Sequence, residues 1–270
     1  MEFNRVAIAL VVAGILSGCS EKGTQKDDAK VQETGQAVIE PGIGLSGSGE
    51  ELYEKNCVKC HGTLGDGKGV QEGVPRVTAR DFTSGVYKYK TTPKGSLPTE
   101  GDLARTIAQG IPGSSMPKFP HLSEADMAVV AEHLLKLSGE KSMGKPIPIP
   151  MPMARFFMKP EKAAAQGSSL YQMLKCVDCH GASGKGDGPL ADKLGKDAWG
   201  NDQKPTDLTS GVFKGGASKH DVYRSLMTGI DGTAMPGFNH VFTSPDGKKI
   251  RRHDAWRLTE YILSLHGTKK

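Results

Sequence analysis

Two segments, one near the middle of the chain and one near its end, carry apolar residues at helical spacing. In the first, apolar side chains recur every three or four residues from Met127 to Leu137, which predicts an amphipathic helix that begins at residues 123–126. The second segment begins near Asp254, and its closing residues 261–265 align with residues 133–137. The pattern therefore predicts two corresponding helices.

Other predicted elements also occur in pairs. Helices are expected to begin at Thr99 and Ser218, because each is followed three residues later by an aspartate in a capping-box arrangement. Gly110 and Gly229 are expected to end them. Each half also contains an earlier helix that runs into a cysteine motif, at about residues 48–59 and 167–178. No β pattern competes with these elements, so the predicted class is all-α.

The two halves are copies of one unit. Cys57 and Cys176 lie 119 residues apart, and so do Met116 and Met235, which end two similar glycine-containing loops. A third matched pair, residues 81–88 and 207–214, is offset by 126, so the second copy carries seven extra residues before it and loses seven after it. The chain is therefore a tandem duplication.

The composition of the chain bears on two questions: which partners the two copies bind, and what fills their interiors. The chain has 35 basic and 30 acidic residues, and this balance, without a long basic run, argues against a nucleic-acid partner. Its 37% hydrophobic and 6% aromatic content is low for the core of a self-sufficient domain. Something other than side chains is therefore expected in the interior.

Four of the five cysteines form two C-x-x-C-H motifs, which are typical of c-type haem attachment. Two thiols one helical turn apart add to the two vinyl groups of a haem, and the adjacent histidine binds the iron. A redox-active dithiol or a four-cysteine zinc site leaves the two histidines unexplained. We therefore expect two haem c groups, with thioethers to Cys57, Cys60, Cys176 and Cys179 and with His61 and His180 as iron ligands.

The fifth cysteine follows a short apolar run. Residues 6–16 are too few to span a bilayer but have the length of a signal-peptide core. The sequence Leu16-Ser17-Gly18-Cys19 resembles the lipobox of bacterial lipoproteins, which implies cleavage after residues 1–18 and lipidation of Cys19. The alternative is an ordinary signal peptide with an incidental cysteine. Residues 19–46 are polar and are expected to form a flexible tether.

Both copies resemble class I cytochrome c domains, each a small helical bundle around one covalently bound haem. The resemblance covers repeat one (residues 47–139) and repeat two (residues 164–270), which a proline-rich linker (residues 140–163) joins. In the family, a glycine and an aromatic residue of the first helix pack against the last helix. Gly49 and Tyr53 match this pattern, whereas their counterparts in repeat two, Gly167 and Tyr171, are each displaced by one residue, which suggests a rotated or looser contact.

The resemblance also concerns the axial ligands. In the family, a proline carbonyl holds the proximal histidine, and the expected candidates are Pro75 for His61 and Pro189 for His180. The family places its axial methionine in a loop like the two found here, so Met116 and Met235 are the expected sixth ligands. Six other histidines are the alternatives, and two of them, His121 and His240, each follow a methionine by five residues. The other four are His133, His220, His253 and His266.

Two further segments allow two interpretations each. Residues 145–152 alternate proline with apolar residues, which fits either a spacer or, as we favour, a strip whose apolar side chains lie across a haem edge or a domain interface. Basic residues gather in a stretch between residues 243 and 253 and in repeat one at Lys88, Lys90 and Lys94. They form either a docking surface for a redox partner or an ordinary solvated face.

The predicted function is a lipid-anchored, periplasm-facing dihaem electron carrier, on the inner or the outer membrane. The expected partners are a quinol-oxidising complex, a terminal oxidase or a reductase of a respiratory chain, and the membrane itself through Cys19. The first alternative is an electron-transfer subunit of a larger dehydrogenase, oxidase or reductase. The second is a dihaem enzyme of the peroxidase or thiosulfate dehydrogenase type. Two equivalent methionine loops leave no open iron and argue against an enzyme.

Overall fold

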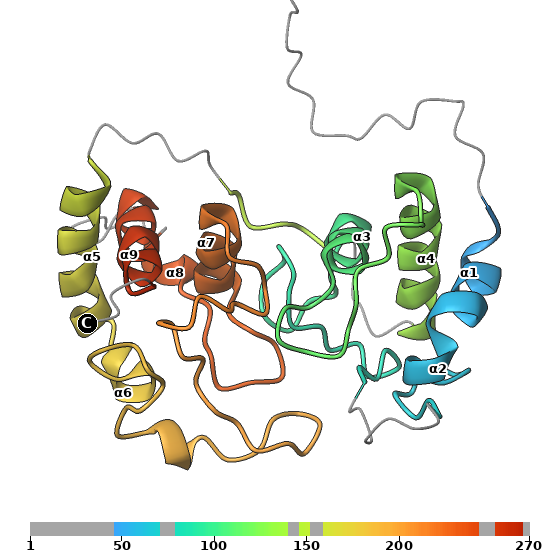
Figure 1. The fold of residues 1–270 in the computed structure, drawn as a ribbon, viewed down its shortest axis with the longest axis horizontal. Helices are drawn as coiled ribbons and strands as arrows, with labels where there is room; N and C mark the ends of the chain where they lie inside the picture. Colours follow the sequence, from blue (N-terminus) through green and yellow to red (C-terminus); the bar gives the residue numbers. More distant parts are fainter. Residues whose placement is uncertain (1–45, 71–78, 140–145, 152–158, 243–251, 267–270) are drawn as a thin grey trace, which may run out of the picture. The chain divides into compact units, whose positions relative to one another are not determined.

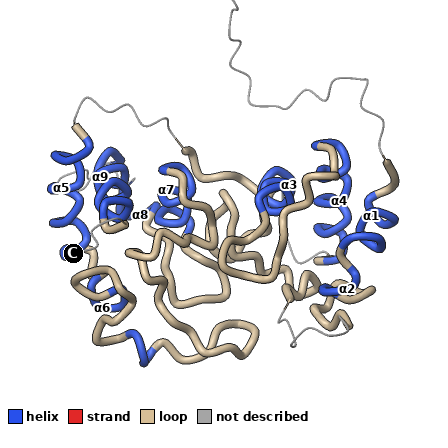
Figure 2. The backbone as a smooth tube through the Cα atoms, viewed as in Figure 1, coloured by secondary structure: helices blue, strands red, loops and turns tan. Residues whose placement is uncertain are grey.

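The computed structural model describes residues 46–70, 79–139, 146–151, 159–242 and 252–266. In these ranges, helices are joined by long loops, and the β pairing consists of one isolated bridge between Lys196 and Asp202 (Figure 2). The predicted all-α class is therefore confirmed. No helix in these ranges has both the length and the apolar character needed to cross a membrane. Cys19, the signal peptide, and all of the tether except Ser46 lie outside the described residues.

The same order of helices occurs twice (Figure 1). Repeat one contains α1 (Gly49–Asn56), α2 (Val58–His61), α3 (Glu100–Gln109) and α4 (Glu124–Leu137). Repeat two contains α5 (Pro160–Met173), α6 (Val177–His180), the 3-10 helix η1 (Ala191–Lys193), α7 (Lys219–Thr228), α8 (Asn239–Phe242) and α9 (Arg252–Ser264). The first helix of each repeat was expected to run into its cysteine motif, to about residue 59 or 178, but α1 ends at Asn56 and α5 ends at Met173, before the first cysteine. Helix α5 also begins seven residues earlier than predicted, because Pro160 suits a first helical position.

The predicted helix starts are confirmed by their caps. Thr99, Ser123 and Ser218 each accept a hydrogen bond from the backbone N–H of an aspartate three residues on, whose carboxylate accepts from the cap's own N–H. The three capping aspartates are buried. The predicted ends at Gly110 and Gly229 are also confirmed, with φ of 64° and 71°.

Each repeat has its own hydrophobic core. In repeat one, Leu52, Tyr53, Val130 and Leu134 are among the buried residues that join α1, α3 and α4. In repeat two, α5, α7 and α9 pack through a corresponding set that includes Tyr171, Tyr223, Trp256 and Leu258. Figure 1 shows the first and last helices of each repeat side by side. Both repeats nevertheless belong to one compact unit of the chain.

Glycine sets the distance between the first and last helices. A Cβ atom on Gly49 would lie 2.2 Å from the carbonyl oxygen of Val129 in α4. A Cβ atom on Gly167 would lie 2.1 Å from the carbonyl oxygen of Arg257 in α9. Neither separation is physically possible, so the two backbones approach this closely only because both residues lack a side chain.

The contact in repeat two is therefore neither rotated nor looser, and that expectation was wrong. The hydroxyl of Tyr171 donates to Gly181 O at 2.8 Å, as Tyr53 does to Gly62 O at 2.7 Å. The extra residue is accommodated after the helix, where Lys175 has φ of 61° and Cys176 N–H donates to Tyr171 O instead of to the residue four before it. An exposed turn absorbs the insertion, so the register of the buried face is preserved.

The linker packs against the repeats, as the alternation of proline and apolar residues suggested. Ile149 is buried and lies in the core cluster of repeat two. Its N–H donates to Thr91 O of repeat one at 2.7 Å. Ile147, by contrast, is 78% exposed. One residue of the linker thus contacts both repeats.

We predict that Gly49→Ala and Gly167→Ala each lower the free energy of unfolding of the haem-loaded protein by about 1–3 kcal/mol, because the new methyl group forces two helices apart. Denaturant unfolding measures the effect. Gly101→Ala is the matched control: Gly101 is exposed in α3, and its Cβ would find nothing nearer than Thr99 Oγ1 at 3.8 Å. It should be neutral or stabilise by about 0.4–1 kcal/mol. Equal effects at positions 49 and 101 would contradict the close-contact explanation.

Candidate haem sites

Each C-x-x-C-H motif forms a single turn that is held by backbone hydrogen bonds and carries two thiols and one imidazole. His61 N–H donates to Cys57 O at 2.9 Å, and His180 N–H donates to Cys176 O at 2.8 Å. Cys60 and Cys179 are held in the same turns through their own N–H groups. Two thiols and one imidazole are thereby presented from each short helix, α2 or α6.

The thiols differ from those of redox-active or zinc-binding pairs. Burial raises the pKa of Cys57 and of Cys176 to about 11, so both stay protonated at neutral pH. Reactive dithiols instead need a lowered thiol pKa. Among the described residues, no group of three or more His, Cys, Asp or Glu side chains is arranged to hold a metal ion, so the two pairs do not meet in one zinc site.

Both motif histidines bond a backbone carbonyl through Nδ1. His61 Nδ1 lies 2.9 Å from Arg80 O, and His180 Nδ1 lies 3.0 Å from Thr206 O. With a hydrogen on Nδ1, the other ring nitrogen, Nε2, keeps its lone pair for an iron atom. Burial also lowers the pKa of both imidazoles, which favours the neutral form that can act as a ligand.

These carbonyls are not the expected ones. Thr206, and not Pro189, accepts from His180. In repeat one Arg80 accepts from His61, and Pro75 lies outside the described residues. A signal for both was present in the sequence, because each accepting residue directly precedes an aspartate of the matched segments 81–88 and 207–214.

That aspartate shapes the turn next to the histidine. Asp81 accepts from Thr83 Oγ1 at 2.6 Å, and Asp207 accepts from Thr209 Oγ1 at 2.6 Å. The next residue packs on the imidazole in repeat one, where the ring of Phe82 stacks on His61 with centroids 4.4 Å apart. Repeat two has Leu208 at that position.

The two methionine loops fold alike. Ile111 N–H donates to Met116 O at 3.1 Å, and Ile230 N–H donates to Met235 O at 3.2 Å. The N–H of each methionine donates to a hydroxyl two residues earlier, that of Ser114 or Thr233, at 3.2 Å. Both methionine side chains are half-buried. Of the alternative ligands, His121 Nε2 instead lies 2.9 Å from Asn56 Oδ1, and His240 is exposed.

Comparison with known proteins identifies the family. A cytochrome c family model matches twice, at residues 47–138 and 164–266. The chain belongs to the cytochrome c family. Cytochrome c domains bind haem c, and two domains with one C-x-x-C-H motif each account for two haem groups.

Two relatives extend the comparison. The chain is 25% identical over 227 residues to FixP, a subunit of a cbb3-type cytochrome c oxidase of Azorhizobium caulinodans. That match covers 81% of this chain and 59% of FixP. In structure it resembles a chain of the reducing HAO-like protein complex Kustc0457/Kustc0458 of Kuenenia stuttgartiensis, with a TM-score of 0.68 and 36% identity over 83% of this chain and 97% of the other.

The surroundings of the motifs also fit haem, which carries two carboxylates. The buried indole Nε1 of Trp199 has no hydrogen-bond partner among the described residues. The guanidinium carbon of Arg80 lies 3.4 Å from the centroid of the same ring, and burial lowers the pKa of Arg80 to about 10. A carboxylate such as a haem propionate is the kind of group that satisfies a buried N–H beside a guanidinium.

The lysines of repeat one contact repeat two and differ in their exposure. Lys88 Nζ lies 3.3 Å from Asp197 Oδ2, and Lys90 Nζ lies 2.7 Å from Asp231 Oδ2. Lys94 Nζ donates to Thr233 O at 2.8 Å. All three bind repeat two. Lys90 is buried, so both interpretations are wrong for this residue, whereas Lys94 is exposed and its part in docking stays a prediction. Most of the other basic stretch, residues 243–251, lies outside the described residues.

We predict that the double variant Cys57→Ser/Cys60→Ser carries one covalent haem and that the wild type carries two. The matched variant Cys176→Ser/Cys179→Ser should also carry one, because each pair serves a separate haem. Intact mass and iron content per chain measure this. A variant that retained two covalent haems would contradict the assignment of the thioethers.

Proposed function

We propose that this protein is a lipid-anchored dihaem cytochrome c that carries single electrons between redox proteins, with His61/Met116 and His180/Met235 as the two axial pairs. The observation that carries the proposal is the duplication of a complete site. Each repeat has a C-x-x-C-H turn, an imidazole held by a backbone carbonyl, and a methionine loop closed by the same hydrogen bonds.

Bound haem iron supplies the one-electron redox chemistry. The carbonyls of Arg80 and Thr206 fix the tautomer and orientation of the two histidines. A methionine thioether is neutral and soft, so it favours ferrous iron and raises the reduction potential. With histidine and methionine on both irons, no position remains for a substrate, which supports electron transfer and argues against an enzyme.

The two relatives favour a particular kind of partner. FixP is a subunit of an oxidase, and the similar solved chain belongs to a complex. A second candidate is therefore an electron-transfer subunit that stays bound to a larger redox complex. Gentle detergent extraction and sizing of the native protein distinguishes this subunit from a carrier that associates only transiently.

The proposed location is the periplasmic side of a bacterial membrane, with Cys19 as the lipidated residue. The lipobox-like sequence of residues 16–19 supports it. We predict that replacing residues 1–19 with an ordinary cleavable signal peptide moves the protein from the membrane fraction to the soluble periplasmic fraction while both haems are retained, because the lipidated thiol is removed and residues 20–270 are unchanged. Fractionation and haem staining test this, and a replaced protein that stayed with the membrane would refute the anchor.

We predict that Met116→Ala and Met235→Ala each remove about half of the Fe–S(Met) absorption at the red edge of the oxidised spectrum and lower the potential of one haem. The double variant should lose all of this absorption. Met151→Ala is the control, because Met151 is half-buried against the core of repeat two but is not proposed as a ligand. Unchanged spectra in both single variants would show that the assigned methionines are wrong.

The carrier proposal has its own test. Reductive titration of the wild type should take up two electrons per chain, one for each haem. Catalytic consumption of peroxide by the isolated protein would instead indicate an enzyme with an open iron.

A further inference from the structure

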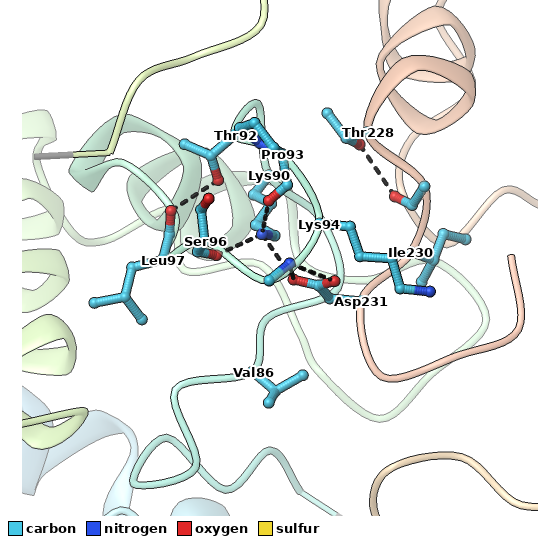
Figure 3. Close-up of polar contacts among 12 residues, drawn as sticks. Val86, Lys90, Thr92, Pro93, Lys94, Ser96, Leu97, Thr228, Ile230 and Asp231 are labelled. Atoms are coloured by element: carbon cyan, nitrogen blue, oxygen red, sulfur yellow. Dashed lines mark hydrogen bonds and ion pairs between the residues drawn. The ribbon is translucent and has the colours of Figure 1, made fainter. Parts of the chain in front are cut away.

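A buried lysine joins the two repeats. Lys90 is 1% exposed, and its Nζ lies 2.7 Å from the carboxylate of Asp231 in repeat two. The same nitrogen donates to Pro93 O at 2.6 Å and to Ser96 O at 2.5 Å (Figure 3). An ammonium group has three hydrogens, so all of its donors are used.

The partner carboxylate belongs to a methionine loop. Asp231 is 5% exposed and follows Ile230, whose N–H closes the loop on Met235 O. Its two carboxylate oxygens also accept from Gly95 N–H, at 3.1 and 3.0 Å. Lys94 adds a bond to Thr233 O in the same loop. The 90–96 turn of repeat one therefore holds the loop that contains Met235 at several points.

This arrangement has no counterpart in the opposite direction. The position that corresponds to Asp231 in repeat one is Pro112, which is exposed and has no carboxylate. Repeat two also has no equivalent of the 90–96 turn, because Thr99 follows Lys88 by eleven residues whereas Ser218 follows Lys214 by four. Among the residues that the structure describes, only the second methionine loop is held by an ion pair from the other repeat.

A buried ion pair adds little to the free energy of unfolding, but it fixes the relative position of the two segments that carry its charges. Removing two charges from water is costly, and their attraction roughly repays that cost. The pair instead requires one arrangement, because any displacement of the loop leaves two buried charges uncompensated. A loop that supplies an iron ligand benefits from this constraint, since ligation depends on where its sulfur lies.

We propose that Lys90 and Asp231 are positioning residues through which repeat one sets the coordination and the reduction potential of the haem in repeat two. The proposal rests on the proposed function, because it takes Met235 as the ligand of that haem. It makes the two haems unequal, although their ligand sets are the same.

The test uses the haem-loaded protein with Lys90→Met, Asp231→Asn and the double variant. Lys90→Met and Asp231→Asn each leave one charge buried without its partner, so the loop should move until that charge reaches water and the Met235 sulfur should bind the iron less well. Because methionine ligation raises the reduction potential, both single variants should lower the potential of the second haem. Each single change should alter the reduction equilibrium constant of that haem at least tenfold, about 59 mV for one electron, and the double variant should lie closer to the wild type.

Spectroelectrochemical titration gives both potentials, and the NMR methyl signal of each ligated methionine shows which haem responds. Signals are assigned with Met116→Ala and Met235→Ala. Lys136→Met is the control, because Lys136 is 70% exposed and pairs only with Glu132 on the same helix. The Met235 signal should shift in both single variants, whereas the Met116 signal should not.

Potential shifts of opposite sign in the two single variants would show that the charges act on the iron directly and not through the loop, and they would overturn the proposal, as would equal shifts at both haems or no shift. If either single variant fails to fold, Lys94→Met, which removes only the exposed bond to Thr233 O, must still shift the Met235 signal. A failure of the proposed function is recognised separately, because Met235→Ala would then leave both methyl signals in place.

Discussion

A histidine that binds haem iron must keep Nε2 available for the metal while the hydrogen of Nδ1 is bonded to another group. Both repeats meet this requirement with a backbone carbonyl, that of Arg80 or Thr206, supplied by a segment well beyond the C-x-x-C-H turn. The loop after each motif must therefore return to the histidine at a fixed point. The aspartate turn that follows each carbonyl and the packing of Phe82 on His61 are consequences of that return.

A second constraint is the close contact between the first and last helices of each repeat. The cysteine turn follows the first helix directly, so this contact sets where the turn lies. Gly49 and Gly167 allow carbonyl oxygens of α4 and α9 to occupy space that any side chain would fill. Repeat two contains one more residue between this contact and its cysteines, and Lys175 absorbs it in a left-handed conformation. A single residue in that conformation costs about 1–2 kcal/mol, less than disrupting a buried helix contact.

Two of the differences between the repeats lie where the repeats meet. The segment that is longer in repeat one holds Lys90 and Lys94, and the segment that is longer in repeat two holds Asp197 and Trp199. The duplicated sites thus stayed alike, while the added residues formed contacts between the two units. These contacts bury charge of both signs, which explains why Lys90 is not part of an open docking surface.

The sequence alone predicted much of the fold and of the candidate sites, because those features depend on local spacing. Thioether chemistry needs two thiols on one turn, capping boxes need a polar residue three positions before an aspartate, and a duplication repeats both. Residues 99, 102, 218 and 221 therefore located helix starts correctly. The tertiary structure alone decided which carbonyl meets each histidine, how the insertion near Lys175 is absorbed, and which lysines are buried. These outcomes depend on atoms that are distant in sequence, and the cost of burying a charge or excluding a side chain is set only when those atoms come together.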